Sequence, residues 1–206
     1  MLQIKGLTVC FKHEELFNGL NLHVKKGEIV CIKGRSGSGK TTLLRAVMGF
    51  VPIKEGSIIV DDTLLTAQTA EAIRKKIAWM PQELAFPVEW VSDMVRIPFG
   101  LKANRGAEFS QKKLLENFAQ LELEEDLLAK RVCEISGGQR QRIMLAVSGM
   151  LNKKLIIVDE PTAALDNVSS YNVLNFMHRL LNNGTSILTV SHDPCFFEGS
   201  TRVFSL

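Results

Sequence analysis

Apolar residues along this chain follow two patterns that are typical of β-strands. Residues 2–11 and 20–24 alternate apolar with polar side chains, which predicts antiparallel strands that bury one face. Residues 28–32, 155–158 and 186–190 are apolar over most or all of their length. Strands of this second kind are buried on both faces, as they are in a parallel sheet. Shorter strands are predicted over 57–60, 77–80 and 202–206.

Between these runs, apolar residues recur at three- and four-residue spacing, which is the period of an amphipathic helix. This spacing predicts helices over 43–50, 70–75, 138–151 and 168–181. Strands therefore alternate with helices along most of the chain. The pattern predicts an α/β fold with a mostly parallel sheet flanked by helices, preceded by an N-terminal antiparallel β subdomain.

The stretch 83–134 departs from this alternation. Leu114, Phe118 and Leu121 stand at helical spacing with charged residues between them. We therefore expect a helical lobe inserted into a single domain that covers 1–206, because a chain of 206 residues can bury one sizeable core without further support.

Composition and charge narrow the possible partners. Hydrophobic residues make up 46% of the chain and charged residues 23%, which is ordinary for a globular protein. The formal net charge is only +3, and Lys and Arg are scattered along the sequence, so we expect no nucleic-acid partner. The four cysteines are far apart and form no zinc motif, which favours reduced thiols in the cytoplasm. No segment reaches the roughly 20 apolar residues of a membrane-spanning helix.

A glycine-rich segment between the strand at 28–32 and the next helix matches the phosphate-loop pattern G-x-x-x-x-G-K-[ST]. Its backbone N–H groups are expected to bind the phosphates of ATP, with the Lys40 ammonium on the β- and γ-phosphates and the Thr41 hydroxyl on Mg²⁺. A dinucleotide fingerprint is excluded because Thr42 occupies the place of its third glycine. The predicted phosphate-binding residues are Gly34, Arg35, Ser36, Gly37, Ser38, Gly39, Lys40, Thr41 and Thr42.

Two carboxylates follow the apolar strand at 155–158. Asp159 and Glu160 leave that strand at its carboxyl end, which is the edge at which parallel sheets bind ligands. Asp159 suits a water-mediated contact with Mg²⁺, and Glu160 suits a general base or water-positioning group for attack on the γ-phosphorus. An acidic strand end is by itself commonly a solvated turn, so this prediction depends on the phosphate loop that precedes it.

The segment 135–142, Ile-Ser-Gly-Gly-Gln-Arg-Gln-Arg, lies just before these carboxylates and resembles the signature motif of ATP-binding cassette (ABC) proteins. Ser136, Gly137 and Gly138 at the start of a helix would make a second anion site, with a free hydroxyl, open N–H groups and the helix dipole. A simple helix cap is the competing interpretation. The resemblance implies that these three residues and Gln139 bind nucleotide, within a phosphate-loop NTPase-type fold.

The smaller motifs of that family follow in order, so that the resemblance covers residues 1–206. Gln82 matches the glutamine loop, Asp166 the D-loop and His192 the switch histidine. The resemblance implies that Gln82 joins the Mg²⁺ shell and senses the γ-phosphate, that His192 hydrogen-bonds it, and that Asp166 lies at the nucleotide site. Phe11 stands where the family places the aromatic that stacks on adenine, with a core phenylalanine as the alternative.

Three positions depart mildly from the family pattern. Ile135, Ala164 and Phe11 replace the usual leucine, serine and tyrosine, so nucleotide affinity and dimer contacts are expected to differ in degree. No group that the chemistry requires is missing.

The resemblance implies the ATP-hydrolysing subunit of an ABC transporter. In that family two copies close head to tail over two ATP molecules and pass the motion to a separate integral membrane permease. The permease holds the cassette at the cytoplasmic face of the inner (plasma) membrane. The implied catalytic residues are Lys40, Gln82, Glu160 and His192, and the implied Mg²⁺ ligands are Thr41, Gln82 and Asp159.

The segment that follows Gln82 carries two aromatics, Phe86 and Trp90, beside the expected γ-phosphate sensor. Such a patch suits a groove for a short helix of the permease, although both rings could instead pack the core of the lobe. One alternative function is a soluble cassette that drives assembly of a partner complex, as an iron–sulfur scaffold cassette does. A nucleotide-binding module without turnover is disfavoured, because Glu160 and His192 are both present.

Overall fold

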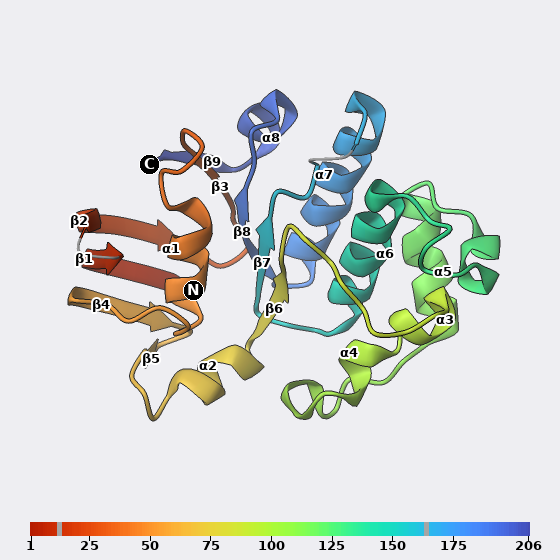
Figure 1. Cartoon of the computed structure of the whole chain (residues 1–206), viewed down its shortest axis with the longest axis horizontal. Coiled ribbons are helices and arrows are strands. Elements are labelled where there is room, and N and C mark those ends of the chain that lie inside the picture. Colours follow the sequence, from red (N-terminus) through yellow and green to blue (C-terminus); the bar gives the residue numbers. More distant parts are fainter. Residues whose placement is uncertain (12–13, 163–164) are drawn as a thin grey trace.

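The computed structural model describes residues 1–11, 14–162 and 165–206. Its strands form two sheets, an antiparallel one in the order β2-β1-β4-β5 and a parallel one in the order β6-β7-β8-β3-β9 (Figure 1). The antiparallel strands are β1 Leu2–Phe11, β2 Glu14–Val24, β4 Glu55–Val60 and β5 Thr63–Leu64. The parallel strands are β3 Ile29–Lys33, β6 Ile77–Met80, β7 Leu155–Asp159, β8 Ser186–Val190 and β9 Arg202–Ser205. The predicted fold class is confirmed.

Helices cover the parallel sheet and build the lobe beside it (Figure 1). The α-helices are α1 Lys40–Val47, α2 Ala70–Lys75, α3 Val91–Met94, α4 Ile97–Gly100, α5 Gln111–Gln120, α6 Gly137–Met150, α7 Asn167–Asn182 and α8 Pro194–Gly199. Two 3₁₀ turns are η1 Lys102–Asn104 and η2 Glu125–Ala129. Sequence periodicity did not predict α8, whose six residues are too few to show a helical repeat.

The parallel sheet separates two apolar cores. On β3, Val30 and Ile32 join the core that α1 and the antiparallel sheet close, whereas Ile29 and Cys31 join the core that α5, α6, α7 and α8 close. Because successive side chains of a strand point to opposite faces, a strand covered on both faces is apolar along most of its length. This explains the continuous apolar runs in the sequence.

Strand β2 begins earlier than the predicted 20–24. Leu7 pairs with Leu20, but Val9 pairs with Phe17, so a bulge interrupts the ladder between β1 and β2. The bulge shifts the side-chain alternation by one residue, which hides the first half of the strand from a period-two pattern. The strand thus continues back to Glu14.

Within the stretch 83–134, helix α5 packs onto α6. Leu114, Phe118 and Leu121 are fully buried there, and the Asn117 side-chain amide donates to the carbonyl of Ala146 on α6 at 2.9 Å. Helix α6 is buried on nearly every side, as expected for a helix with apolar residues all round. It therefore ties the lobe to the parallel sheet.

One close backbone contact in the antiparallel sheet tests this architecture. A Cβ atom added at Gly56, where φ is +90°, would lie 2.4 Å from the carbonyl oxygen of Gly6. We predict that Gly56→Ala lowers the free energy of unfolding by about 3–5 kcal/mol. Gly184→Ala is the matched control, because φ there is +81° but no atom lies near the added Cβ. This variant should lose only the free energy of placing alanine in a left-handed backbone, about 1–2 kcal/mol. Equal losses for both variants in urea unfolding would contradict the close approach of β4 to β1.

Candidate functional site

The phosphate loop leaves β3 and enters α1 through left-handed glycines. Gly37 has φ +80° and Gly39, the residue that caps α1, has φ +89°. A Cβ at Gly39 would lie 2.8 Å from the ring of Phe17, which is buried on β2. Glycine is required at this position by backbone conformation and by space, so the antiparallel sheet holds the loop in place.

Lys40 is the first residue of α1 and is only 8% exposed. Its ammonium donates to the carbonyls of Gly34 and Arg35, both at 3.0 Å. A buried ammonium held by neutral carbonyls, close to backbone N–H groups, makes a positively polarised cradle. Within the described residues, the buried hydroxyl of Ser38 has no hydrogen-bond partner, which leaves a further donor in this cradle.

Asp159 is the last residue of β7 and faces the start of α1. The Thr41 hydroxyl donates to Asp159 Oδ2 at 2.8 Å, across 118 residues of sequence. The other carboxylate oxygen, Oδ1, is buried, and no donor of the described chain reaches it. An unpaired buried carboxylate oxygen beside a hydroxyl is an oxygen-rich site that fits a hard cation such as Mg²⁺.

Glu160 follows with a left-handed backbone, at φ +52°. Its N–H donates to the carbonyl of Val190 at the end of β8, at 3.0 Å. A non-glycine residue in this region is uncommon and is found at active sites where neighbours hold it. The turn separates the two carboxylates, so that Asp159 remains in the sheet while Glu160 faces His192.

His192 lies within ion-pair distance of Glu160. Its Nε2 is 3.3 Å from Glu160 Oε1, and its side chain is 53% exposed whereas that of Glu160 is 13% exposed. The carboxylate is therefore largely shielded from water, and the imidazole stands at the rim of the site. Gln82, which follows β6, reaches the same cavity.

These residues line one open cavity of about 640 Å³ at the carboxyl ends of the parallel strands. It gathers all of the predicted catalytic and metal residues. It also includes Leu16 and Val190, which the sequence motifs did not predict. Lining residues include Ser36, Gly37, Gly39, Lys40, Thr41, Thr42, Gln82, Asp159, Glu160 and His192.

Burial dominates the electrostatics of both carboxylates. It raises the pKa of Glu160 above the ordinary glutamate value, against the opposing charges of His192 and Lys40. It likewise raises the pKa of Asp159, although the hydrogen bond from Thr41 and the charge of Arg45 act in the opposite direction. A carboxylate that is poorly solvated is a stronger base, which suits Glu160 for activating water.

Two side chains of the signature helix α6, not assigned roles from the sequence, connect the site internally. Gln141 Nε2 lies 3.4 Å from the carbonyls of Gln82 and Glu160. Arg140 donates to the carbonyls of Leu84 and Val132, at 3.3 and 2.9 Å. Only the tertiary structure shows these contacts, because the acceptors are backbone atoms of distant loops.

Ser136 does not line the nucleotide cavity of its own chain. It caps α6: its Oγ accepts from the Gln139 N–H at 3.0 Å, and the Gln139 side chain accepts from the Ser136 N–H at 2.9 Å. The Ser136 hydroxyl, which we expected to be free, therefore accepts a hydrogen bond as a helix cap. Its own proton can still be donated to a ligand. Gly137 and Gly138 retain free N–H groups, because the first turn of a helix has no internal acceptors.

The remaining predicted residues either do not line this cavity or lie outside the part of the chain that the structure describes. Asp166 caps α7 by accepting from the Ser169 N–H at 2.8 Å. The side chain of Phe11 and the residue Ala164 lie outside the part that the structure describes. The adenine contact expected for Phe11 therefore stays a prediction.

Residues 17–163 match the family model described as ABC transporter. The chain belongs to this family. As an ABC cassette, it binds and hydrolyses ATP. None of the helices in the described residues is long and apolar enough to cross a membrane.

Relatives with established names support this assignment. The manganese transport system ATP-binding protein MntB of Listeria monocytogenes is 32% identical over 200 residues, covering 93% of this chain and 80% of that protein. The glutamine transport ATP-binding protein GlnQ of Escherichia coli is 31% identical over 203 residues, covering 96% and 83%. A dimeric cassette structure in a post-hydrolysis state, bound to ADP and phosphate, is 28% identical with a TM-score of 0.86, covering 100% of this chain and 94% of that one.

The raised pKa of Glu160 predicts the pH dependence of the ATPase. A base must be ionised, so activity should fall as pH drops through the raised pKa, above the ordinary value of about 4.3 for glutamate. The measurement is kcat at saturating MgATP across a pH series, with circular dichroism confirming the fold at each pH. An acid limb at or below the ordinary value would contradict the role of burial. The control is ATP binding by Glu160→Gln over the same pH series. It should show no such fall at low pH.

Proposed function

We propose that two copies of this cassette close head to tail over two ATP molecules, with Ser136 of one copy facing the phosphate loop of the other. One observation carries this proposal. Ser136 and Gly137 are exposed to solvent, and neither of them lines the cavity that contains Lys40. One chain thus presents two incomplete anion sites. The similar cassette structure with ADP and phosphate bound is dimeric, which supports the formation of a dimer.

Mg²⁺ would be held by Thr41, Asp159 and Gln82. The unpaired Oδ1 of Asp159 and the Thr41 hydroxyl beside Oδ2 supply oxygen ligands of the preferred kind. When bound, the ion supplies charge neutralisation for the phosphate oxygens.

Hydrolysis then depends on residues already in place. The Lys40 ammonium stabilises charge on the β- and γ-phosphates, while Glu160 accepts a proton from the water that attacks the γ-phosphorus in line. His192, 3.3 Å from Glu160, orients that carboxylate and hydrogen-bonds the γ-phosphate. Loss of the γ-phosphate removes the contacts that ADP cannot make, so the dimer reopens.

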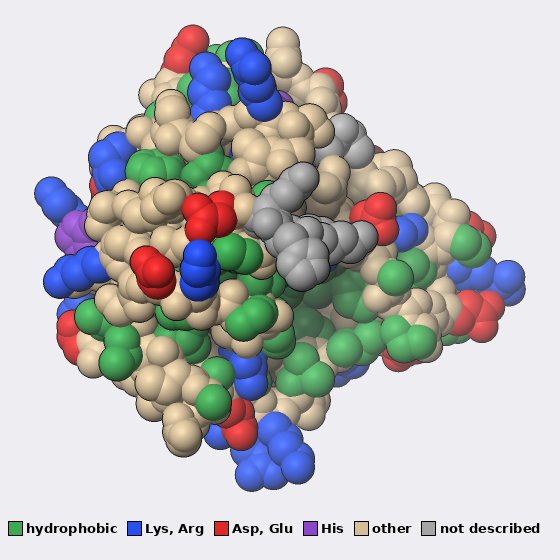
Figure 2. Space-filling view, turned by 60° about the vertical axis from the view of Figure 1, so that its left-hand side comes forward, with side chains coloured by type: hydrophobic (Ala, Val, Ile, Leu, Met, Phe, Trp, Pro, Cys, Tyr) green, Lys and Arg blue, Asp and Glu red, His purple; other side chains and the backbone are tan. Residues whose placement is uncertain are grey.

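The segment from Phe86 to Trp90 is proposed as the contact with the permease at the cytoplasmic face of the membrane. Phe86 is partly buried against the lobe core, whereas the Trp90 ring is 40% exposed with the Arg131 guanidinium over it. The space-filling view shows apolar side chains along a hollow beside the helical lobe (Figure 2). Arg140 holds the Leu84 carbonyl, so movement of this segment is linked to the signature helix.

The names of the relatives favour transport over the assembly of a soluble partner complex. Two of them are the ATP-binding proteins of manganese and glutamine transport systems, and the probable iron export ATP-binding protein FetA of Escherichia coli is a third, 27% identical and covering 100% of this chain. Cargo and direction differ among these relatives. We therefore propose the transport role without assigning a cargo.

A variant that binds ATP without hydrolysing it tests the dimer. Glu160→Gln should elute as a dimer with MgATP and as a monomer with MgADP in size-exclusion chromatography, and its turnover should fall at least about a hundredfold. Adding Ser136→Asp keeps a good helix cap but places a carboxylate against the partner's γ-phosphate. This double variant should bind ATP yet remain monomeric. A dimer that survives the second change would exclude the head-to-tail arrangement.

The permease contact is tested in a reconstituted transporter. Trp90→Asp removes an exposed ring that does not line the nucleotide cavity, so basal ATPase of the isolated cassette should persist while ATP-driven transport falls about tenfold or more. Phe86→Ala should act in the same direction with an added loss of stability, since this ring is partly buried. Val203→Asp on β9, at 36% exposure, is the control for a new surface carboxylate. Unchanged transport by Trp90→Asp would remove this segment from the contact.

A further inference from the structure

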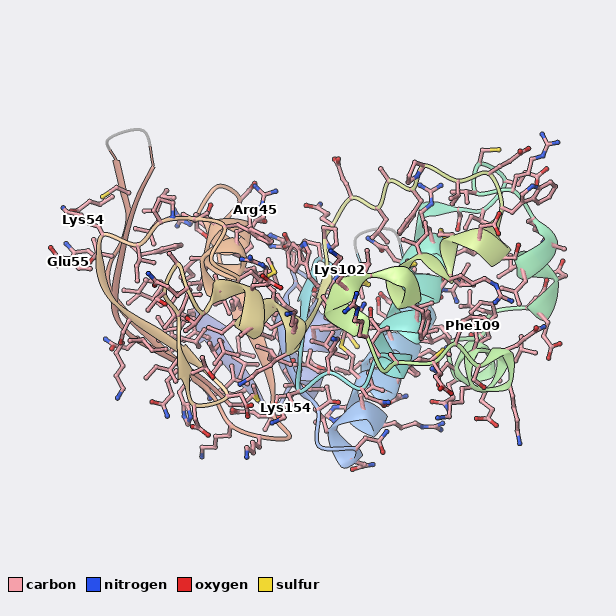
Figure 3. All side chains as sticks on the ribbon, turned by 90° about the horizontal axis from the view of Figure 1, so that it is seen from below. Arg45, Lys54, Glu55, Lys102, Phe109 and Lys154 are labelled. Atoms are coloured by element: carbon pink, nitrogen blue, oxygen red, sulfur yellow. The ribbon has the colours of Figure 1, made fainter. Side chains whose placement is uncertain are left out.

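A second cavity, of about 530 Å³, opens at the edge of the parallel sheet opposite the nucleotide site. Lys76 directly precedes β6 and Lys154 directly precedes β7, so this cavity lies at the amino ends of the strands. Viewed from that side, Lys102 and Lys154 lie on different elements near the middle of the molecule (Figure 3). Half of the lining residues are cationic, namely Lys75, Lys76, Lys102, Arg105, Lys153 and Lys154.

Few carboxylates neutralise these cations. Asp61 accepts ion pairs from both Lys76 and Lys154, at 3.1 and 2.9 Å, and Glu71 pairs with Lys75 at 2.8 Å. Six cations therefore share two carboxylates, which leaves an excess of four positive charges. Within the described chain, Lys102 and Arg105 have no carboxylate partner.

Lys153 is the least solvated of the six. It is 9% exposed, and its ammonium donates to the carbonyls of Lys75 at 2.7 Å and Ala103 at 2.8 Å. Burial lowers the pKa of this group, because no ionised partner compensates for the lost water. A buried ammonium held only by neutral carbonyls is costly, and an anion in the adjoining cavity would offset that cost.

The cavity also spans two parts of the molecule. Lys75 and Lys154 belong to the sheet-bearing core, whereas Lys102 and Arg105 lie in the inserted helical lobe at η1. Lys153 already links the two through its carbonyl acceptors. A ligand here would contact both parts, at a distance from the γ-phosphate cavity.

We propose that this cavity binds a multiply charged phosphate ligand and clamps the helical lobe to the core. Its volume suits a compact small-molecule ligand rather than a folded partner. Lysine ammonium groups are compact point charges that pair well with phosphate oxygens, and a tri- or tetra-anion matches the charge excess. The site is separate from the phosphate loop and independent of the function proposed for it.

The test is isothermal titration with inorganic tripolyphosphate. Saturating ADP without Mg²⁺ occupies the nucleotide cavity and leaves the probe unchelated. The native chain should bind tripolyphosphate, and Lys102→Ala with Arg105→Ala, which removes two of the three cations that have no carboxylate partner, should weaken binding at least about tenfold. Lys112→Ala with Lys113→Ala, on the exposed surface of α5, removes the same charge elsewhere and should change the affinity less than about twofold.

A third variant tests whether removing a negative charge from this cluster strengthens the binding of tripolyphosphate. Asp61→Asn removes the carboxylate that competes for Lys76 and Lys154, and asparagine tolerates the φ of +46° at this position. It should tighten tripolyphosphate binding. Absence of binding to the native chain, or equal losses in both double variants, would overturn the proposal.

Two sources of phosphate are separated by sedimentation with vesicles. Vesicles of phosphatidylcholine containing phosphatidylglycerol present a phosphate headgroup, and phosphatidylcholine alone is the neutral control. Sedimentation that Lys102→Ala with Arg105→Ala abolishes would assign the cavity to a lipid headgroup. If tripolyphosphate binds but sedimentation is unaffected by these changes, the ligand is a free phosphate compound.

Discussion

The burial of the parallel sheet on both faces is the constraint on which the rest of this structure depends. Strands covered by α1 on one side and by α6 and α7 on the other carry mostly apolar side chains along their length, with Ser186 and Thr189 as buried polar exceptions on β8. The carboxylates of the site stand where a strand ends. The nucleotide site forms at the carboxyl ends of these strands, with Asp159 as the last residue of β7 and Glu160 just beyond it.

This constraint also brings distant segments into the close contacts that catalysis needs. The hydrogen bond from Thr41 to Asp159 joins the start of α1 to the end of β7, and the backbone bond from Glu160 to Val190 joins the next turn to β8. Both depend on strands of the parallel sheet ending at the same edge. A shift of one residue in β7 would reverse the side that the Asp159 carboxylate faces.

Helix α6 is the second organising element, because one of its ends carries the signature motif and its length carries the lobe. Arg140 and Gln141 hold backbone carbonyls of the segment after β6 and of Glu160, so these loops move with the helix. Helix α6 thereby connects Gln82, Glu160 and the exposed Ser136, for which we propose the roles of γ-phosphate sensor, general base and anion site for a second copy. Charged groups gather at the opposite edge of the sheet too, where lysines from three segments meet.

The sequence alone determined the alternation of strands and helices, the phosphate loop, the two carboxylates and the order of the family motifs, because each depends on neighbours within a few residues. It did not reveal the bulge at Val9, helix α8, or the contacts of Arg140. Lys and Arg look scattered along the chain, yet six of them line one cavity. Only the tertiary structure decided these features, since they arise where segments far apart in sequence are packed against each other, and local periodicity carries no record of which segments will meet.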